Sequence, residues 1–177
     1  MDAQAAAEIR VLRDMGVLRP ESSVVDLGAG SGQFALAVAE LCNRVVAVDI
    51  SPVMLGQLRK KLEASQLSNV ETIDAGFLSY EHAGEAADVV YSRYALHHLP
   101  DFWQAIALDR IAGMLRPGGV FRCQMSSTAS NRLTPSSASK RGSRRRWQAT
   151  SRLAGHGLNS PNTCATSIRR SPGCWSR

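Results

Sequence analysis

The feature that most constrains the fold is a glycine-rich stretch at residues 24–32, which reads Val-Val-Asp-Leu-Gly-Ala-Gly-Ser-Gly. Apolar residues on both sides of Asp26 are typical of a strand that is buried on both faces, as in a parallel sheet. Glycines directly after such a strand let the backbone turn tightly and approach a ligand closely. Residues 33–42 then predict an amphipathic helix, so a ligand at this turn would meet the unpaired N–H groups of a helix start.

The spacing of the glycines separates two kinds of nucleotide-binding loop. Dinucleotide-binding loops follow the pattern G-x-G-x-x-G. Here the third glycine comes one residue early, and Gln33 occupies the expected position. This offset disfavours a nicotinamide-dependent oxidoreductase, which stays open as a distant alternative. A glycine turn that binds no ligand is the other interpretation.

The charge distribution divides the 177 residues into two parts. Residues 1–122 contain 11 Lys and Arg and all 15 Asp and Glu, whereas residues 123–177 contain 10 Lys and Arg and no acid. We therefore expect a folded domain over residues 1–125 and a disordered, basic, Ser- and Arg-rich tail over residues 126–177.

Several features lead us to expect a cytoplasmic protein without a metal site. No apolar run reaches the roughly 18 residues of a membrane span. No signal peptide is visible at the N-terminus, because charged residues interrupt it. The four cysteines are widely spaced and form no metal-binding pair.

Strand and helix patterns alternate along the first 122 residues. Helices are predicted at residues 3–16, 33–42, 103–115 and from residue 51, and strands at 23–27, 44–49, 69–74, 88–92 and from residue 120. The alternation predicts an α/β fold with a doubly wound, Rossmann-like sheet that is incomplete after its fifth strand. Ligands in such sheets bind beyond the carboxyl ends of the strands. Asp26, Asp49, Gly76 and Ser92 all fall at that edge.

Four stretches in order resemble the motifs of class I S-adenosylmethionine (SAM) dependent methyltransferases of the small-molecule type. They are V-V-D-L-G-A-G-S-G at 24–32, V-V-A-V-D-I-S at 45–51, Y-S-R-Y-A-L-H-H-L-P-D at 91–101 and L-R-P-G-G-V-F at 115–121. The resemblance covers about residues 8–122. It implies a methyltransferase fold, SAM as the cofactor and an unidentified small molecule as the methyl acceptor.

The resemblance also implies which residues bind the cofactor. Asp49, at the end of the second strand, suits both ribose hydroxyls, although a charge at a helix start is its other possible role. Met54 suits either the adenine face or the core, and either Asp74 or the backbone N–H of Phe77 would meet adenine. The set expected to bind SAM is Asp26, Gly28, Ala29, Gly30, Gly32, Asp49, Ile50, Met54, Gly76, Phe77 and Ser92.

His97 and His98 are the candidates for catalysis. Methyl transfer is an in-line displacement, in which the protein mainly positions the two partners. A base is needed only where the nucleophile must first lose a proton. The resemblance places both histidines near the substrate, and imidazole titrates in the suitable range. The alternative is one histidine that caps a turn and one that packs in the core.

The resemblance implies two further strands that complete a seven-stranded sheet, and we expect the tail to lack them. One hypothesis is a shift of the reading frame near residues 122–125. The codons that could encode the chain from His156 onward can be read in the frame that starts at the third base of each codon. This shifted frame permits a run of residues with acidic and aromatic side chains and helical spacing. The chain would then be a truncated remnant that at most binds SAM. The alternative is a genuine basic tail that binds nucleic acid or an acidic partner through residues 144–147.

Overall fold

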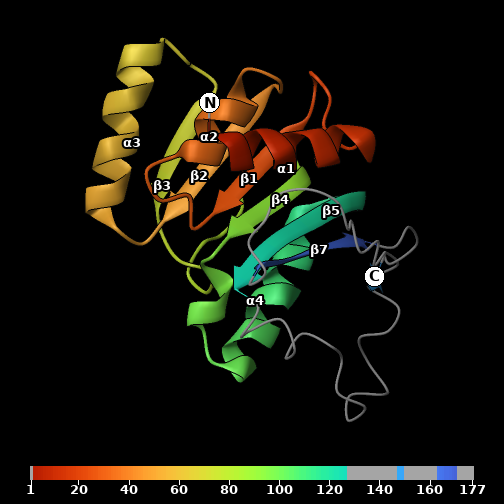
Figure 1. Ribbon diagram of the computed structural model, residues 1–177. Coiled ribbons are helices and arrows are strands. Elements are labelled where there is room, and N and C mark those ends of the chain that lie inside the picture. Colours follow the sequence, from red (N-terminus) through yellow and green to blue (C-terminus); the bar gives the residue numbers. More distant parts are fainter. Residues whose placement is uncertain (1, 127–146, 150–162, 171–177) are drawn as a thin grey trace.

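The computed structural model describes residues 2–126, 147–149 and 163–170. Its parallel strands are β1 Ser23–Leu27, β2 Arg44–Asp49, β3 Val70–Asp74, β4 Ala87–Arg93 and β5 Leu115–Ser126. They lie in the order β3-β2-β1-β4-β5, so the chain changes its direction across the sheet beside β1 (Figure 1). This order confirms the Rossmann-like α/β fold, and it places the expected ligand site at the carboxyl ends of β1 and β4.

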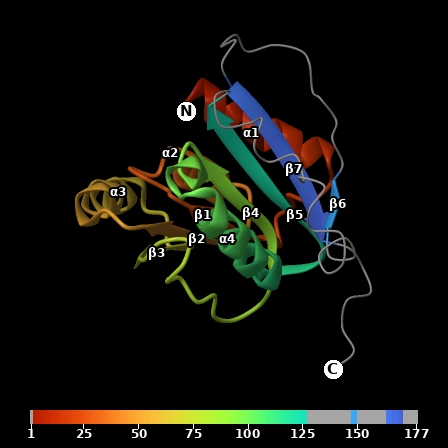
Figure 2. The ribbon, with the colours of Figure 1, turned by 90° about the horizontal axis from the view of Figure 1, so that it is seen from below.

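Helices cover both faces of this sheet (Figures 1 and 2). They are α1 Ala3–Asp14, α2 Gln33–Ala39, α3 Pro52–Ser65, the 3-10 helix η1 Leu96–His98 and α4 Asp101–Met114. One apolar core joins Leu12 of α1 and Leu58 of α3 to Val24 of β1, and the other joins Ile111 of α4 to Val25 of β1. Neighbouring strand residues point to opposite faces, so the apolar run in β1 serves both cores.

Two further strands extend the sheet beyond β5. β7 Thr163–Arg170 pairs antiparallel with β5, and β6 Trp147–Ala149 pairs antiparallel with β7. The sequence predicted five strands and an irregular tail, so these strands are a difference from that prediction. A strand at the edge of a sheet leaves a row of N–H and C=O groups unpaired, and the threonines and isoleucine of β7 favour strand formation.

The rest of the tail lies outside the described residues. This applies to residues 127–146, 150–162 and 171–177, and therefore to most of the segment that the sequence predicts to be disordered. The disorder, the basic segment at 144–146 and the shifted reading frame stay predictions.

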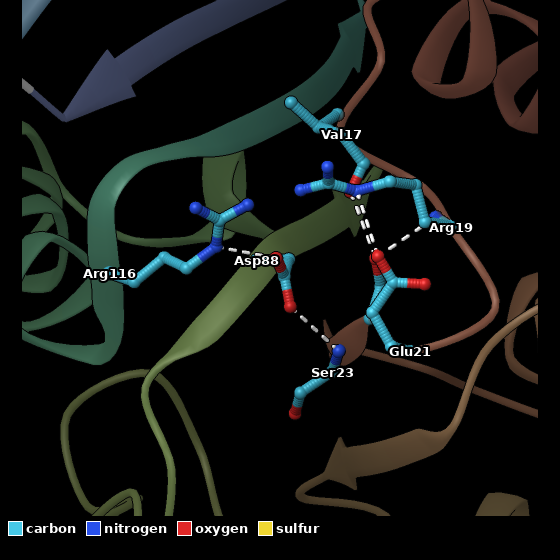
Figure 3. A network of polar contacts seen from close by, with 7 residues as sticks. Val17, Arg19, Glu21, Ser23, Asp88 and Arg116 are labelled. Carbon is cyan, nitrogen blue, oxygen red and sulfur yellow. Dashed lines mark hydrogen bonds and ion pairs between the residues drawn. The ribbon is translucent and has the colours of Figure 1, made fainter.

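A polar network ties the strands together at the amino edge of the sheet (Figure 3). Asp88 of β4 accepts a hydrogen bond from the N–H of Ser23 on β1 at 2.9 Å, and it forms an ion pair with Arg116 of β5. Arg19 and Glu21 form a further ion pair, at 3.3 Å, in the segment that leads into β1. This network lies at the opposite edge from the glycine loop, so its role is to hold three strands in register.

Candidate functional site

The glycine loop between β1 and α2 is held by the neighbouring strand. The N–H groups of Gly28 and Ala29 donate to the carbonyl of Val48 on β2, at 2.8 and 3.0 Å. Gly28 and Gly32 have φ angles of +77° and +82°, which glycine adopts without strain. A Cβ atom at Gly28 would also lie 2.4 Å from the Cβ of Ala95. The loop is therefore fixed at the carboxyl edge, and its glycines are required by geometry.

The carboxylate of Asp49 connects the loop to the next helix. From the end of β2, its Oδ2 accepts the N–H of Gly30 at 2.7 Å, and its Oδ1 accepts the N–H of Ser51 at 2.8 Å. Ser51 caps α3, where its Oγ accepts the N–H of Met54 at 3.4 Å. Asp49 thus supports the start of α3. Its ribose-binding role stays a prediction, and each carboxylate oxygen has a further lone pair for it.

A cavity of about 210 Å³ opens beside the loop. Its walls are Asp26, Gly28, Ala29, Gly30, Ser31, Gln33, Phe34, Tyr91, Arg93 and Tyr94. Phe34 of α2 stacks on Tyr91 of β4, with ring centroids 3.7 Å apart. The hydroxyl of Tyr91 is buried and has no hydrogen-bond partner in the described part of the chain. Buried polar groups are normally paired, so this hydroxyl is a polar group that the fold leaves unsatisfied in the wall of the cavity.

Asp26 is the acidic group in the cavity wall, and only 2% of the residue is exposed. Burial raises the pKa of its carboxyl from 3.8 to about 7; Arg93 opposes this shift and Asp49 adds to it. The unfolded chain therefore ionises this group at lower pH than the folded chain does. Because the pKa of Asp26 is higher in the folded chain than in the unfolded chain, the folded state loses stability as the pH rises from about 4 to 7.

The residues predicted around adenine lie beyond the ends of β2 and β3. Ile50 and Met54 are 76% and 39% exposed, and a Cβ at Gly76 would lie 3.7 Å from the Cδ1 of Ile50. Phe77 is half-buried and packs against the apolar core on the α4 side, while Asp74 is exposed. The structure thus brings Ile50 and Gly76 together beside an exposed apolar surface, and it gives Phe77 a contact with the core.

The end of β4 contributes residues that the sequence analysis missed. Tyr91, Arg93 and Tyr94 line the cavity, whereas Ser92 is fully buried and does not line it. Alternate residues of a strand share a face, so Tyr91 and Arg93 lie together and Ser92 points the other way. Tyr91 also pairs in register with Asp26 on β1. The alternation of side chains along the strand is the sequence signal that could have identified Tyr91 and Arg93 in place of Ser92.

His97 and His98 lie in η1, directly after this stretch, and their ring centroids are 4.2 Å apart. Burial, and after it the charge of His98, lowers the pKa of His97. The Nδ1 of His97 is buried without a hydrogen-bond partner in the described part. A neutral imidazole is able to accept a proton, but neither histidine is among the described residues that line the cavity beside the glycine loop.

The rest of the described chain contains a second cavity, but no cluster that could hold a metal and no helix suited to crossing a membrane. A second cavity, of about 330 Å³, lies between α4 and the segment before β4, and it contains none of the predicted site residues. Over residues 2–126, 147–149 and 163–170, His, Cys, Asp and Glu side chains form no group of three that could hold a metal. No helix in these ranges has the length and apolar character needed to cross a membrane.

Comparison with known proteins identifies curated relatives of this chain. Trans-aconitate 2-methyltransferase of Deinococcus radiodurans is 34% identical over 136 residues, which cover 72% of this chain and 49% of the relative. Demethylmenaquinone methyltransferase of Bacillus cereus is 28% identical over 109 residues, which cover 60% of this chain and 45% of the relative. The chain therefore spans about half the length of these relatives.

A solved structure and a family model agree with this result. The N-methyltransferase NodS of Bradyrhizobium japonicum, in complex with S-adenosyl-L-homocysteine (SAH), matches with a TM-score of 0.72 and 19% identity, over 94% of this chain and 85% of that one. This likeness shows a shared fold. The family model described as a methyltransferase domain matches residues 24–119, which is more than half of the chain. The chain therefore belongs to the class I SAM-dependent methyltransferases.

Proposed function

We propose that this chain transfers a methyl group from SAM to a small-molecule acceptor. The observation that carries the proposal is the cavity at the carboxyl edge, where the glycine loop, a buried carboxylate and an unpaired hydroxyl meet. Both curated relatives described above are named for small-molecule acceptors, trans-aconitate and demethylmenaquinone. The acceptor of this chain is a separate question, because the family motifs are specific for the cofactor.

The proposed binding roles follow the order of the elements along the edge. The backbone of the glycine loop holds the methionyl and ribose parts, and Asp49 accepts the ribose hydroxyls. Ile50, Met54 and Gly76 provide the surface for adenine. When bound, SAM supplies an electrophilic methyl group on a positively charged sulfur. The residues of the chain hold this group in line with the acceptor and exclude water from it.

Asp26 gives the proposed site a pH dependence. A carboxylate binds the ammonium group of the methionyl part only when it is ionised. With a pKa of about 7 for Asp26, we expect the affinity for SAH to rise by about five- to tenfold between pH 6 and pH 7.5. Isothermal titration calorimetry at constant ionic strength measures this. Asp26→Asn should remove the dependence, and an equally steep profile in that variant would contradict the role of Asp26.

His97 is the proposed proton acceptor for an acceptor molecule that must lose a proton. The neighbouring histidine provides a matched control. We expect His97→Gln to lower kcat by about 100-fold and His98→Gln to lower it by less than about threefold, with the affinity for SAH unchanged in both. Equal losses in the two variants would show that the histidines act as a structural pair.

Methyl transfer itself is tested with methyl-labelled SAM and a panel of carboxylic acids, hydroquinones and amines, after SAH binding has been measured by calorimetry. Transfer to one of these classes supports the proposal. Binding of SAH without transfer to any of them favours the truncated remnant. Absence of binding, or displacement of SAH by a nicotinamide dinucleotide, refutes the proposal.

The shifted reading frame has its own test, which is the nucleotide sequence across codons 115–177. A shifted frame that stays open and continues past codon 177 with acids and aromatics supports the hypothesis. Stop codons in that frame refute it.

A further inference from the structure

Arg93 lies where the cavity meets the N-terminal helix. It is the last residue of β4, and among the described residues that line the cavity it is the one cation. Its Nη1 donates to the Oδ2 of Asp2 at 3.1 Å and to the Oε1 of Gln4 at 3.3 Å, and its Nη2 donates to the Oε1 of Gln33. One guanidinium therefore joins the end of a central strand, the start of α1 and the start of α2.

The cavity presents two opposite charges to a ligand. The carboxylate of Asp26 and the guanidinium of Arg93 both lie in its wall, and they are close enough to influence one another. A small site with one carboxylate and one guanidinium complements an α-amino acid, which has one ammonium and one carboxylate. Tyr91, whose hydroxyl is unpaired in the described part of the chain, belongs to the same wall.

The guanidinium of Arg93 already forms an ion pair with a carboxylate of the chain itself, that of Asp2. Its Oδ1 accepts the N–H of Gln4 at 3.1 Å and so caps α1, while its Oδ2 pairs with Arg93. The side chains of Arg93 and Asp2 are 16% and 28% exposed, so a carboxylate from outside has access to the pair. Such a carboxylate would compete for the Nη1 that Asp2 and Gln4 use.

We infer that Arg93 binds the α-carboxylate of the cofactor in exchange for Asp2, so that cofactor binding loosens the start of α1. The inference rests on the proposed function, because it takes the methionyl part of SAM as the ligand. Asp26 holds the ammonium, Gln33 keeps the guanidinium turned toward the cavity, and Arg93 selects ligands that carry the carboxylate. The start of α1 is then held by Arg93 in the absence of the cofactor and released when the cofactor binds.

The test compares SAH with decarboxylated SAH, which is the same molecule without the carboxylate, by calorimetry on the whole chain. The wild-type chain should prefer SAH by about 30-fold. Arg93→Met should reduce this preference to less than about threefold, and its affinity for the decarboxylated ligand should stay close to that of the wild type. Arg44→Met removes a guanidinium at the amino edge and should leave the preference unchanged.

Asp2→Asn tests the exchange separately. Asparagine still caps a helix, but it no longer competes as an anion for Arg93. This variant should bind SAH about two- to fivefold more tightly and the decarboxylated ligand as the wild type does. SAH should also increase the rate of amide hydrogen exchange in the first turn of α1, and decarboxylated SAH should not.

The outcomes separate this inference from the proposed function. An unchanged preference in Arg93→Met, with Asp2→Asn equal to the wild type, overturns the role of Arg93 and leaves SAM binding intact. Failure of the wild-type chain to bind either ligand overturns both. Because Asp2→Asn leaves Arg93 in place, it decides the question of exchange even if Arg93→Met does not fold.

Discussion

Asp49→Ala is expected to weaken SAH binding by about 100-fold or more. Asp49 accepts the N–H groups of Gly30 and Ser51, at 2.7 and 2.8 Å, and it is proposed to accept the two ribose hydroxyls. A hydrogen bond to a charged group contributes about 1.5–3 kcal/mol, so losing both ribose contacts costs about 3–6 kcal/mol. Calorimetry measures the affinity, and circular dichroism should show that the helices and the sheet are retained.

Asp74 provides the matched control for this variant. It pairs in register with Asp49 on the neighbouring strand, and it is exposed. Asp74→Ala should change the affinity for SAH by less than about threefold, because adenine is proposed to lie on Ile50, Met54 and Gly76. A large loss in Asp74→Ala would instead assign the adenine amino group to that carboxylate. An unchanged affinity in Asp49→Ala would remove the ribose assignment.

The parallel part of the fold is predictable because its signals are local. Each buried strand is an apolar run, as in Val24 and Val25, and each helix has a periodic apolar face. The position of the site follows from the same pattern, since the carboxyl ends of parallel strands share one edge. The two strands from the tail were not predicted, because residues 163–170 carry no apolar alternation that distinguishes them from the rest of a serine-rich segment.

The cavity wall is less predictable, since most of its contacts depend on tertiary structure. The glycine loop is predicted from its spacing, and Asp49 from its place at the end of the second strand pattern. Arg93 contacts Asp2 across 91 positions of sequence and Gln33 across 60, so no local pattern predicts these pairs. Burial, which raises the pKa of Asp26, likewise depends on helices and strands that come from distant parts of the sequence.

Glu8 of α1 shows how a polar residue can lie inside an apolar stripe. Residues Ala5, Glu8, Ile9 and Leu12 form the buried face of this helix. The carboxylate of Glu8 faces Arg122 of β5, with Nε to Oε2 at 2.6 Å and Nη2 to Oε1 at 3.1 Å. Both side chains are only 7% exposed. Two parallel hydrogen bonds fix the geometry of this pair, and it connects the N-terminal helix to the last parallel strand.

Breaking this ion pair is expected to have the largest effect on stability. Glu8→Gln removes the negative charge that faces the buried guanidinium of Arg122, so the free energy of unfolding should fall by about 3–5 kcal/mol. Urea denaturation of the whole chain measures this difference. The exposed pair of Arg44 and Glu71, at 2.7 Å, is the control, and Glu71→Gln should cost less than about 1 kcal/mol.

A double variant can show whether the loss of stability in Glu8→Gln comes from a buried charge or from the missing hydrogen bonds. If the cost comes from an uncompensated buried charge, replacing both partners by apolar residues should recover most of it. Glu8→Leu combined with Arg122→Met should therefore be more stable than Glu8→Gln alone by about 2 kcal/mol or more. A double variant as unstable as the single one would show that the two hydrogen bonds themselves hold α1 on the sheet. In that case α1 depends on Arg122 at its middle as well as on Arg93 at its start, and the proposed release of its first turn by the cofactor would leave the rest of the helix in place.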